Sequence, residues 1–108
     1  MSAMAMPIAA KNVDAWKAWA GELTGARKTE FEDMNKRFGL TEHRAYLQPT
    51  PDGNFLAVIV QEGPGSETFA AKLVASDHPF DRWFVQTIAG VHGIDPNTQA
   101  PPVPARYV

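Results

Sequence analysis

The sequence contains no cysteine, and this absence excludes several kinds of site together. A chain without thiols cannot form a disulfide scaffold, a thiolate zinc site or a cysteine nucleophile. The lack of cysteine also fits a reducing compartment, and we expect a cytoplasmic location.

The chain also lacks an excess of basic residues and any long apolar run. Its 10 Lys and Arg against 12 Asp and Glu give a net charge of −2. Nucleic-acid binding, which depends largely on a basic surface, is therefore not expected. No segment approaches the roughly 20 apolar residues of a membrane span. Residues 1–16 lack the cationic region and the apolar run of a signal peptide. We expect neither nucleic acid nor a membrane as a partner.

What remains is the composition of an ordinary globular domain, 44% hydrophobic and 20% charged. A length of 108 residues suits one domain with one core. We expect a single domain over 1–108, with a proline-rich tail from about residue 95; a short final strand within this tail is one alternative.

The first half of the chain changes from a two-residue to a helical period. Residues 3–9 alternate as in a short strand, with Pro7 at an edge or at its end. An amphipathic helix is then predicted, with Asn12 as its N-cap. A second helical pattern follows Gly25, and the capping-box form of "TEFE" (29–32) predicts that the helix restarts there. Gly39 is suited to end it.

The second half predicts a hairpin followed by two helices. Residues 41–48 and 54–61 are expected to be strands, because "PTPDGN" between them is a turn sequence. Ser66 is expected to cap a short helix, and the stretch 76–93 predicts another that ends at Gly93. The order strand, split helix, strand, strand, split helix predicts an α+β fold: a ferredoxin-like antiparallel sheet with helices on one face.

The strand 54–61 is apolar on both of its faces. Phe55, Ala57 and Ile59 lie on one face, and Leu56, Val58 and Val60 lie on the other. Monomers usually avoid exposing such a row. We therefore expect a homodimer in which two sheets pack face to face.

Strand order, small size and this doubly apolar strand resemble the dimeric α/β-barrel superfamily of ferredoxin-like proteins. The segments "AMPI", "YLQPTPDGNFLAVIV" and "SDHPFDRWF…HGID" are similar to a set of small bacterial proteins without an assigned function. The resemblance implies a dimeric α/β barrel. The superfamily includes cofactor-free monooxygenases, isomerases and haem-binding or haem-degrading members, but function depends on the site rather than the fold.

The haem-degrading members use a tryptophan and a histidine on the second helical region, together with an asparagine near the first strand. Trp83 and His92 are the matching residue types here. On a straight helix, however, they lie roughly opposite each other, and the first strand carries no asparagine. Haem binding or degradation, with His92 as the iron ligand, is kept as an alternative; the main expectation is a protein without a cofactor.

The helix 76–93 can also be read as purely structural. Its expected core stripe is formed by Phe80, Phe84, Ile88 and Val91. In that reading His78 is solvated at the boundary, Asp81 favours the first turn, Arg82 is a surface charge and His92 contacts the last carbonyls of its own helix. The spacing of the three histidines predicts no metal site.

A ligand site, if present, is expected between the sheet and the helices. His43 and His92 are the candidate catalytic groups, and Arg44, Tyr46 and Trp83 are the candidate ligand-binding residues. Alternation places His43 and Tyr46 on opposite faces, so only one can face the helices. Arg44 shares the face of Tyr46 and could anchor an anion or pair with Glu42 across the dimer.

Two functions therefore stay open at this stage. One is the binding or conversion of a small apolar molecule without a cofactor, as in a monooxygenase or isomerase. The other is a non-catalytic structural or regulatory dimer. An enclosed interior reached by a titratable side chain would favour the first.

Overall fold

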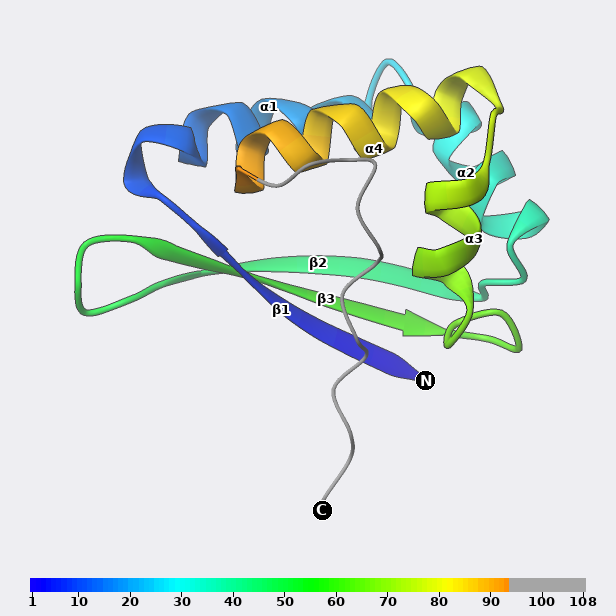
Figure 1. The fold of residues 1–108 in the computed structure, drawn as a ribbon, viewed down its shortest axis with the longest axis horizontal. Helices are drawn as coiled ribbons and strands as arrows, with labels where there is room; N and C mark the ends of the chain where they lie inside the picture. The colour runs from blue at the N-terminus through cyan, green and yellow to red at the C-terminus, as the bar shows by residue number, and fades with distance from the viewer. Residues whose placement is uncertain (94–108) are drawn as a thin grey trace.

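All four α-helices lie on one side of a twisted antiparallel sheet in the computed structural model, which describes residues 1–93 (Figure 1). The tail and the strand expected within it fall outside these residues. The elements in chain order are β1 (Ser2–Ile8), the 3-10 helix η1 (Ala10–Asn12), α1 (Val13–Thr24), α2 (Lys28–Arg37), β2 (Glu42–Pro49), β3 (Phe55–Glu62), α3 (Phe69–Ala75) and α4 (Pro79–His92).

The sheet has the order β1-β3-β2, and both neighbouring pairs are antiparallel. Val58 at its centre is paired with Ala5 of β1 and with Tyr46 of β2. The expectation of an α+β fold with an antiparallel sheet is thus confirmed. A ferredoxin-like sheet has four strands, whereas residues 1–93 supply three.

Alternation along β3 divides the sheet into two different faces. Ala57 and Gln61 are buried beneath the helices, and Phe55 and Ile59 pack against the same core. Leu56, Val58 and Val60 lie on the opposite face and are only half-buried. The described helices leave this second face uncovered (Figure 1).

Three predicted side-chain caps are absent, although Asn12 does stand at the N-cap position of α1. Asn12 and Thr68, which precede α1 and α3, have helical backbone angles and make no side-chain cap, because a turn leads directly into each helix. The Asn12 amide instead donates to the carbonyl of Val91 (3.1 Å). Ser66 is buried, and its carbonyl accepts a hydrogen bond from Ser2. The predicted restart of the helix is confirmed, since α1 ends at Thr24 and α2 begins at Lys28, but no side chain caps α2.

The helix predicted for 76–93 is present as α4, and Gly93 ends it with φ 68°. Phe80, Phe84 and Val91 are buried, so most of the predicted stripe is confirmed. His78 is exposed, as expected, but it also caps the helix by accepting a hydrogen bond from the Phe80 amide.

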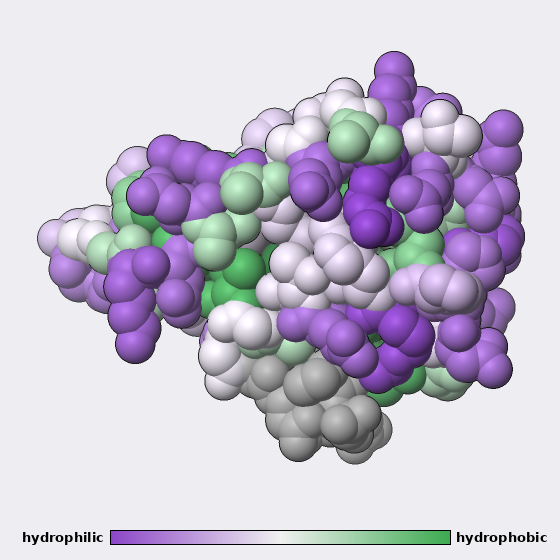
Figure 2. Space-filling view, turned by 90° about the horizontal axis from the view of Figure 1, so that it is seen from above, coloured by the Kyte–Doolittle hydropathy of each residue, from purple (hydrophilic) through white to green (hydrophobic). Residues whose placement is uncertain are grey.

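The upper surface of the helix layer is mainly polar, but apolar side chains are visible on the half nearer the β2–β3 hairpin (Figure 2). Among residues 1–93, no helix combines the length and the apolar composition required to cross a bilayer.

Candidate functional site

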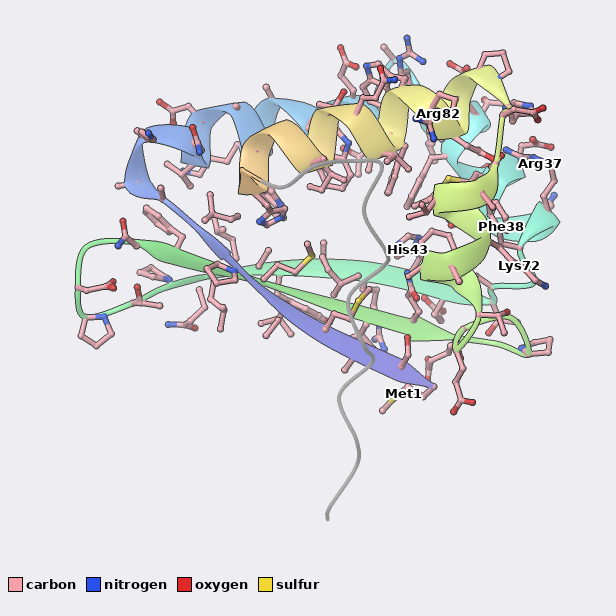
Figure 3. The ribbon with its side chains drawn as sticks, in the orientation of Figure 1. Met1, Arg37, Phe38, His43, Lys72 and Arg82 are labelled. Atoms are coloured by element: carbon pink, nitrogen blue, oxygen red, sulfur yellow. The ribbon has the colours of Figure 1, made fainter. Side chains whose placement is uncertain are left out.

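His43 is the member of the His43–Tyr46 pair that faces the helices (Figure 3). It lies at the start of β2, and its imidazole is surrounded by aromatic rings. Phe31 and Phe69 each lie 5.1 Å from it between centroids, and Phe84 lies 6.3 Å away. Tyr46 is 52% exposed on the other face.

A chain of hydrogen bonds fixes the protonation of His43. Its Nδ1 lies 2.8 Å from Asn35 Oδ1, and its Nε2 lies 3.2 Å from Gln61 Nε2. Because an amide oxygen only accepts and an amide nitrogen only donates, Nδ1 carries the proton and Nε2 accepts. The other end of the Gln61 amide accepts from Ser2 Oγ (3.2 Å). His43 is therefore neutral, and both of its ring nitrogens are occupied.

Burial lowers the pKa of His43 to about 4 from 6.5. The unfolded chain consequently binds a proton at His43 more readily than the folded chain does between these two values. Above about pH 6.5 the ring is neutral in both states, and the contribution of His43 to stability is complete. As the pH falls from 6.5 towards 4, the unfolded chain takes up a proton that the folded chain does not, so the free energy of unfolding decreases.

We expect this loss to be about 3 kcal/mol of unfolding free energy between pH 6.5 and pH 4. Urea unfolding at a series of pH values measures it, and an NMR titration of the ring measures the pKa of His43 directly. The variant His43→Gln should have a shallower pH dependence over this range. An unchanged dependence in the variant would assign the effect to other groups.

His92 occupies a different part of the interior. It was expected to contact the last carbonyls of its own helix, and this was wrong: its Nδ1 lies 2.8 Å from the carbonyl oxygen of Pro7 in β1. The twist of the sheet brings the end of β1 beneath the end of α4 (Figure 1). Burial lowers the pKa of His92, and the bond to Pro7 offsets this only in part.

Two tryptophans of α1 form part of the same interior and were not among the predicted site residues. Trp16 is 5% exposed and Trp19 is 6% exposed, and their rings lie 6.1 Å apart. The Trp19 ring meets Phe84 edge-on at 5.0 Å. In the sequence, helical periodicity places Trp16 on the apolar stripe of this helix and Trp19 on the flank of that stripe, which predicts burial but no site. The available signal was that a buried indole requires a partner for its N–H.

Three buried ring nitrogens have no hydrogen-bond partner among the described residues: Trp16 Nε1, Trp19 Nε1 and His92 Nε2. An unpaired buried polar group costs about 1–3 kcal/mol, and protein interiors contain few of them. The interior between α1 and the end of α4 therefore contains polar ring nitrogens that form no hydrogen bond within the described part of the chain.

Trp83 and His92 lie far apart on α4 and contact different residues. The Arg27 guanidinium lies over the Trp83 ring, 4.2 Å from its centroid, and the Phe80 ring is 5.5 Å away. His92, nine residues later, is about 13 Å further along the helix axis and is bonded to Pro7.

The other two predicted ligand-binding residues belong to the uncovered face of the sheet. Tyr46 is exposed there, and Arg44 lies beside Glu62 of β3 in the same chain (3.6 Å). Both Arg44 and Glu62 are about half exposed, so this ion pair contributes little to stability. The structure therefore brings neither Arg44 nor Tyr46 into the interior with His43.

No group of three or more potential metal-ligating side chains occurs within residues 1–93. No family model matches the sequence, and comparisons with curated proteins and with solved structures likewise find no match.

Proposed function

We propose that the protein binds a small, largely apolar molecule between the sheet and the helices. The observation that carries this proposal is that the ring nitrogens of Trp16, Trp19 and His92 have no hydrogen-bond partner within residues 1–93. A core that serves only for packing favours phenylalanine or leucine at such positions, because these side chains leave no polar atom unpaired. A ligand that exchanges hydrogen bonds with these nitrogens removes the cost of burying them.

The surroundings suit an apolar ligand. Phe84 connects the tryptophan pair to the aromatic rings around His43, and Ile59 and Leu47 of the sheet pack against the same core. The resemblance to dimeric α/β barrels agrees with a ligand in this position. Conversion of the ligand without a cofactor, in the manner of a monooxygenase or isomerase, is the enzymatic form of the proposal.

The uncharged fluorophore N-phenyl-1-naphthylamine tests for this site. We expect saturable binding of about one molecule per chain, with energy transfer from tryptophan to the probe. The variant Trp83→Phe should retain the transfer, since Trp16 and Trp19 then remain as the only donors among the three tryptophans. Absence of saturable binding at micromolar protein would contradict the proposal.

We also propose that the protein is a homodimer whose uncovered sheet faces pack together. The centre of this face is apolar, formed by Leu56, Val58 and Val60 with the small side chains of β1. Its edge carries both signs of charge, because Arg44 lies beside Glu62. A patch with an apolar centre and mixed edge charges is complementary to itself under a two-fold axis, which favours a second copy as its occupant.

Replacing Val58 with lysine is expected to give a folded monomer. Val58 is central on this face, and two lysines brought together there would be buried without partners. Sedimentation should show a species of about twice 11.8 kDa for the wild type and a species of 11.8 kDa for Val58→Lys. The matched control Gln86→Lys adds the same charge at an exposed position of α4 and should remain dimeric. A monomeric wild-type protein at micromolar concentration would contradict the proposal.

A non-catalytic structural or regulatory dimer is the second candidate. It is supported by the engagement of His43, since both of its ring nitrogens are hydrogen-bonded within the chain. A dimer that fails to bind the naphthylamine probe would favour this candidate over the first.

A further inference from the structure

The three ring nitrogens that lack a partner in the described part of the chain differ in hydrogen-bonding character, and this difference defines a ligand. An indole N–H can only donate, so Trp16 and Trp19 each require an acceptor. His92 Nδ1 faces the Pro7 carbonyl oxygen, which can only accept, so Nδ1 carries the proton of the neutral ring. Its buried Nε2 is consequently a bare acceptor that requires a donor.

Trp16 and His92 belong to one junction of the fold. The side-chain amide of Asn12, in the turn that leads into α1, donates to the Val91 carbonyl in the last turn of α4. Trp16 follows Asn12 by one helical turn, and helical side chains lean back towards the preceding turn. His92 directly follows Val91, and its imidazole reaches β1 beneath the two helices.

Resting on the proposed function, we infer that the ligand is an uncharged aromatic molecule carrying both a carbonyl oxygen and a hydroxyl group. The indole N–H groups of Trp16 and Trp19 donate to the carbonyl oxygen, and the hydroxyl donates to His92 Nε2. The ligand is uncharged because an ionic group among these aromatic side chains would lose its hydration. It is planar and aromatic because the neighbouring walls are indole and phenyl rings.

Three naphthalenes of similar shape separate these requirements. 6-Acetyl-2-naphthol has both groups, 6-acetyl-2-methoxynaphthalene has a blocked hydroxyl, and 6-ethyl-2-naphthol has no carbonyl. Binding to the full-length protein at pH 7 is followed by the anisotropy of each probe. We expect 6-acetyl-2-naphthol to bind about tenfold more tightly than either of the other two, as the loss of one buried hydrogen bond implies.

Two variants assign the atoms. Asparagine in His92→Asn keeps a donor near Pro7 and has no atom at the position of Nε2, so the preference for hydroxyl over methoxy should disappear. The double variant Trp16→Phe/Trp19→Phe keeps the aromatic rings and removes both N–H groups, so the preference for acetyl over ethyl should disappear. The controls His78→Asn and Trp83→Phe, whose rings lie outside the unpaired set, should retain both preferences.

Each other result has a defined meaning. If all three naphthalenes and the naphthylamine bind within twofold of one another, the hydroxy-carbonyl ligand is wrong and the apolar site stands. If the preferences persist in both variants, the assignment to His92 and the tryptophans is wrong. If no probe binds, this inference and the proposed function fail together.

Discussion

The replacement of Gly65 by alanine is expected to destabilise the protein by about 3 kcal/mol or more. Gly65 precedes α3 and packs directly on the turn after α2: a Cβ at this position would overlap the carbonyl group of Phe38 and crowd Gly39 Cα at 3.3 Å. The Gly65 amide also donates to the Gly39 carbonyl (3.0 Å). The obstructing atoms are backbone atoms, so no side chain can rotate to make room. Overpacking typically costs 1–3 kcal/mol, and a backbone clash falls at or above the upper end.

Urea unfolding of the two proteins measures this difference, and Gly90→Ala is the matched control. Gly90 lies within α4, and a Cβ there meets no atom within 4 Å. Alanine is favoured over glycine in a helix by about 1 kcal/mol, so the control should unfold at the same or a higher urea concentration. Equal stability of Gly65→Ala and the wild type would show that the two turns do not pack as described.

The sequence predicted best those features that local chemistry determines. The β2–β3 hairpin follows from the Asp52-Gly53 turn, in which Asp52 accepts hydrogen bonds from Thr50 and Asn54. The limits of α4 follow from Pro79 at the first helical position and from Gly93 in the left-handed region at its end. Each of these features depends on residues within a few positions of one another, and a periodic pattern can reveal them.

The candidate site depends on contacts between distant parts of the chain, and these could not be predicted. His92 meets Pro7 across 85 residues, and Gln61 meets Ser2 across 59. Alternation could state that only one of His43 and Tyr46 faces the helices, but not which one, because both faces of the neighbouring strand are apolar. The ring nitrogens of Trp16 and Trp19 could not be singled out either. Helical periodicity shows that a tryptophan is buried, but it does not show whether its N–H has a partner.

Asp81 is the clearest case of a residue whose environment the sequence did not indicate. It was expected to be a first-turn carboxylate stabilised by the helix dipole, and this was incomplete: its side chain is fully buried. Arg37 binds it with two hydrogen bonds of 2.8 and 2.7 Å, and Ser76 Oγ donates at 2.6 Å. Burial raises the pKa of Asp81, but the hydrogen bonds from Arg37 and Ser76 outweigh burial and hold the pKa below its usual value.

Replacing Arg37 with methionine is expected to cost about 3–5 kcal/mol of unfolding free energy at pH 7, because a buried carboxylate then loses its counterion. Arg37 lies at the end of α2, partly exposed, so methionine can follow the path of its aliphatic stem (Figure 3). Urea unfolding is the measurement. Asp33, an exposed partner of Arg37 at 2.8 Å, supplies the control Asp33→Asn, which should cost less than about 1 kcal/mol.

A second change distinguishes charge burial from loss of packing. In the double variant Arg37→Met/Asp81→Asn the buried group is neutral, so stability should recover above that of Arg37→Met alone.

The pH dependence of stability that Asp81 contributes should also change sign when Arg37 is replaced. In the wild type the lowered pKa of Asp81 makes its contribution largest at neutral pH and lost as the pH falls through the folded value. Without Arg37, burial raises the pKa of Asp81, so acidification from pH 7 towards 4 should reduce the deficit relative to the wild type. A deficit that is independent of pH, with no recovery in the double variant, would show that Arg37 stabilises the fold through its stem and not through the buried carboxylate.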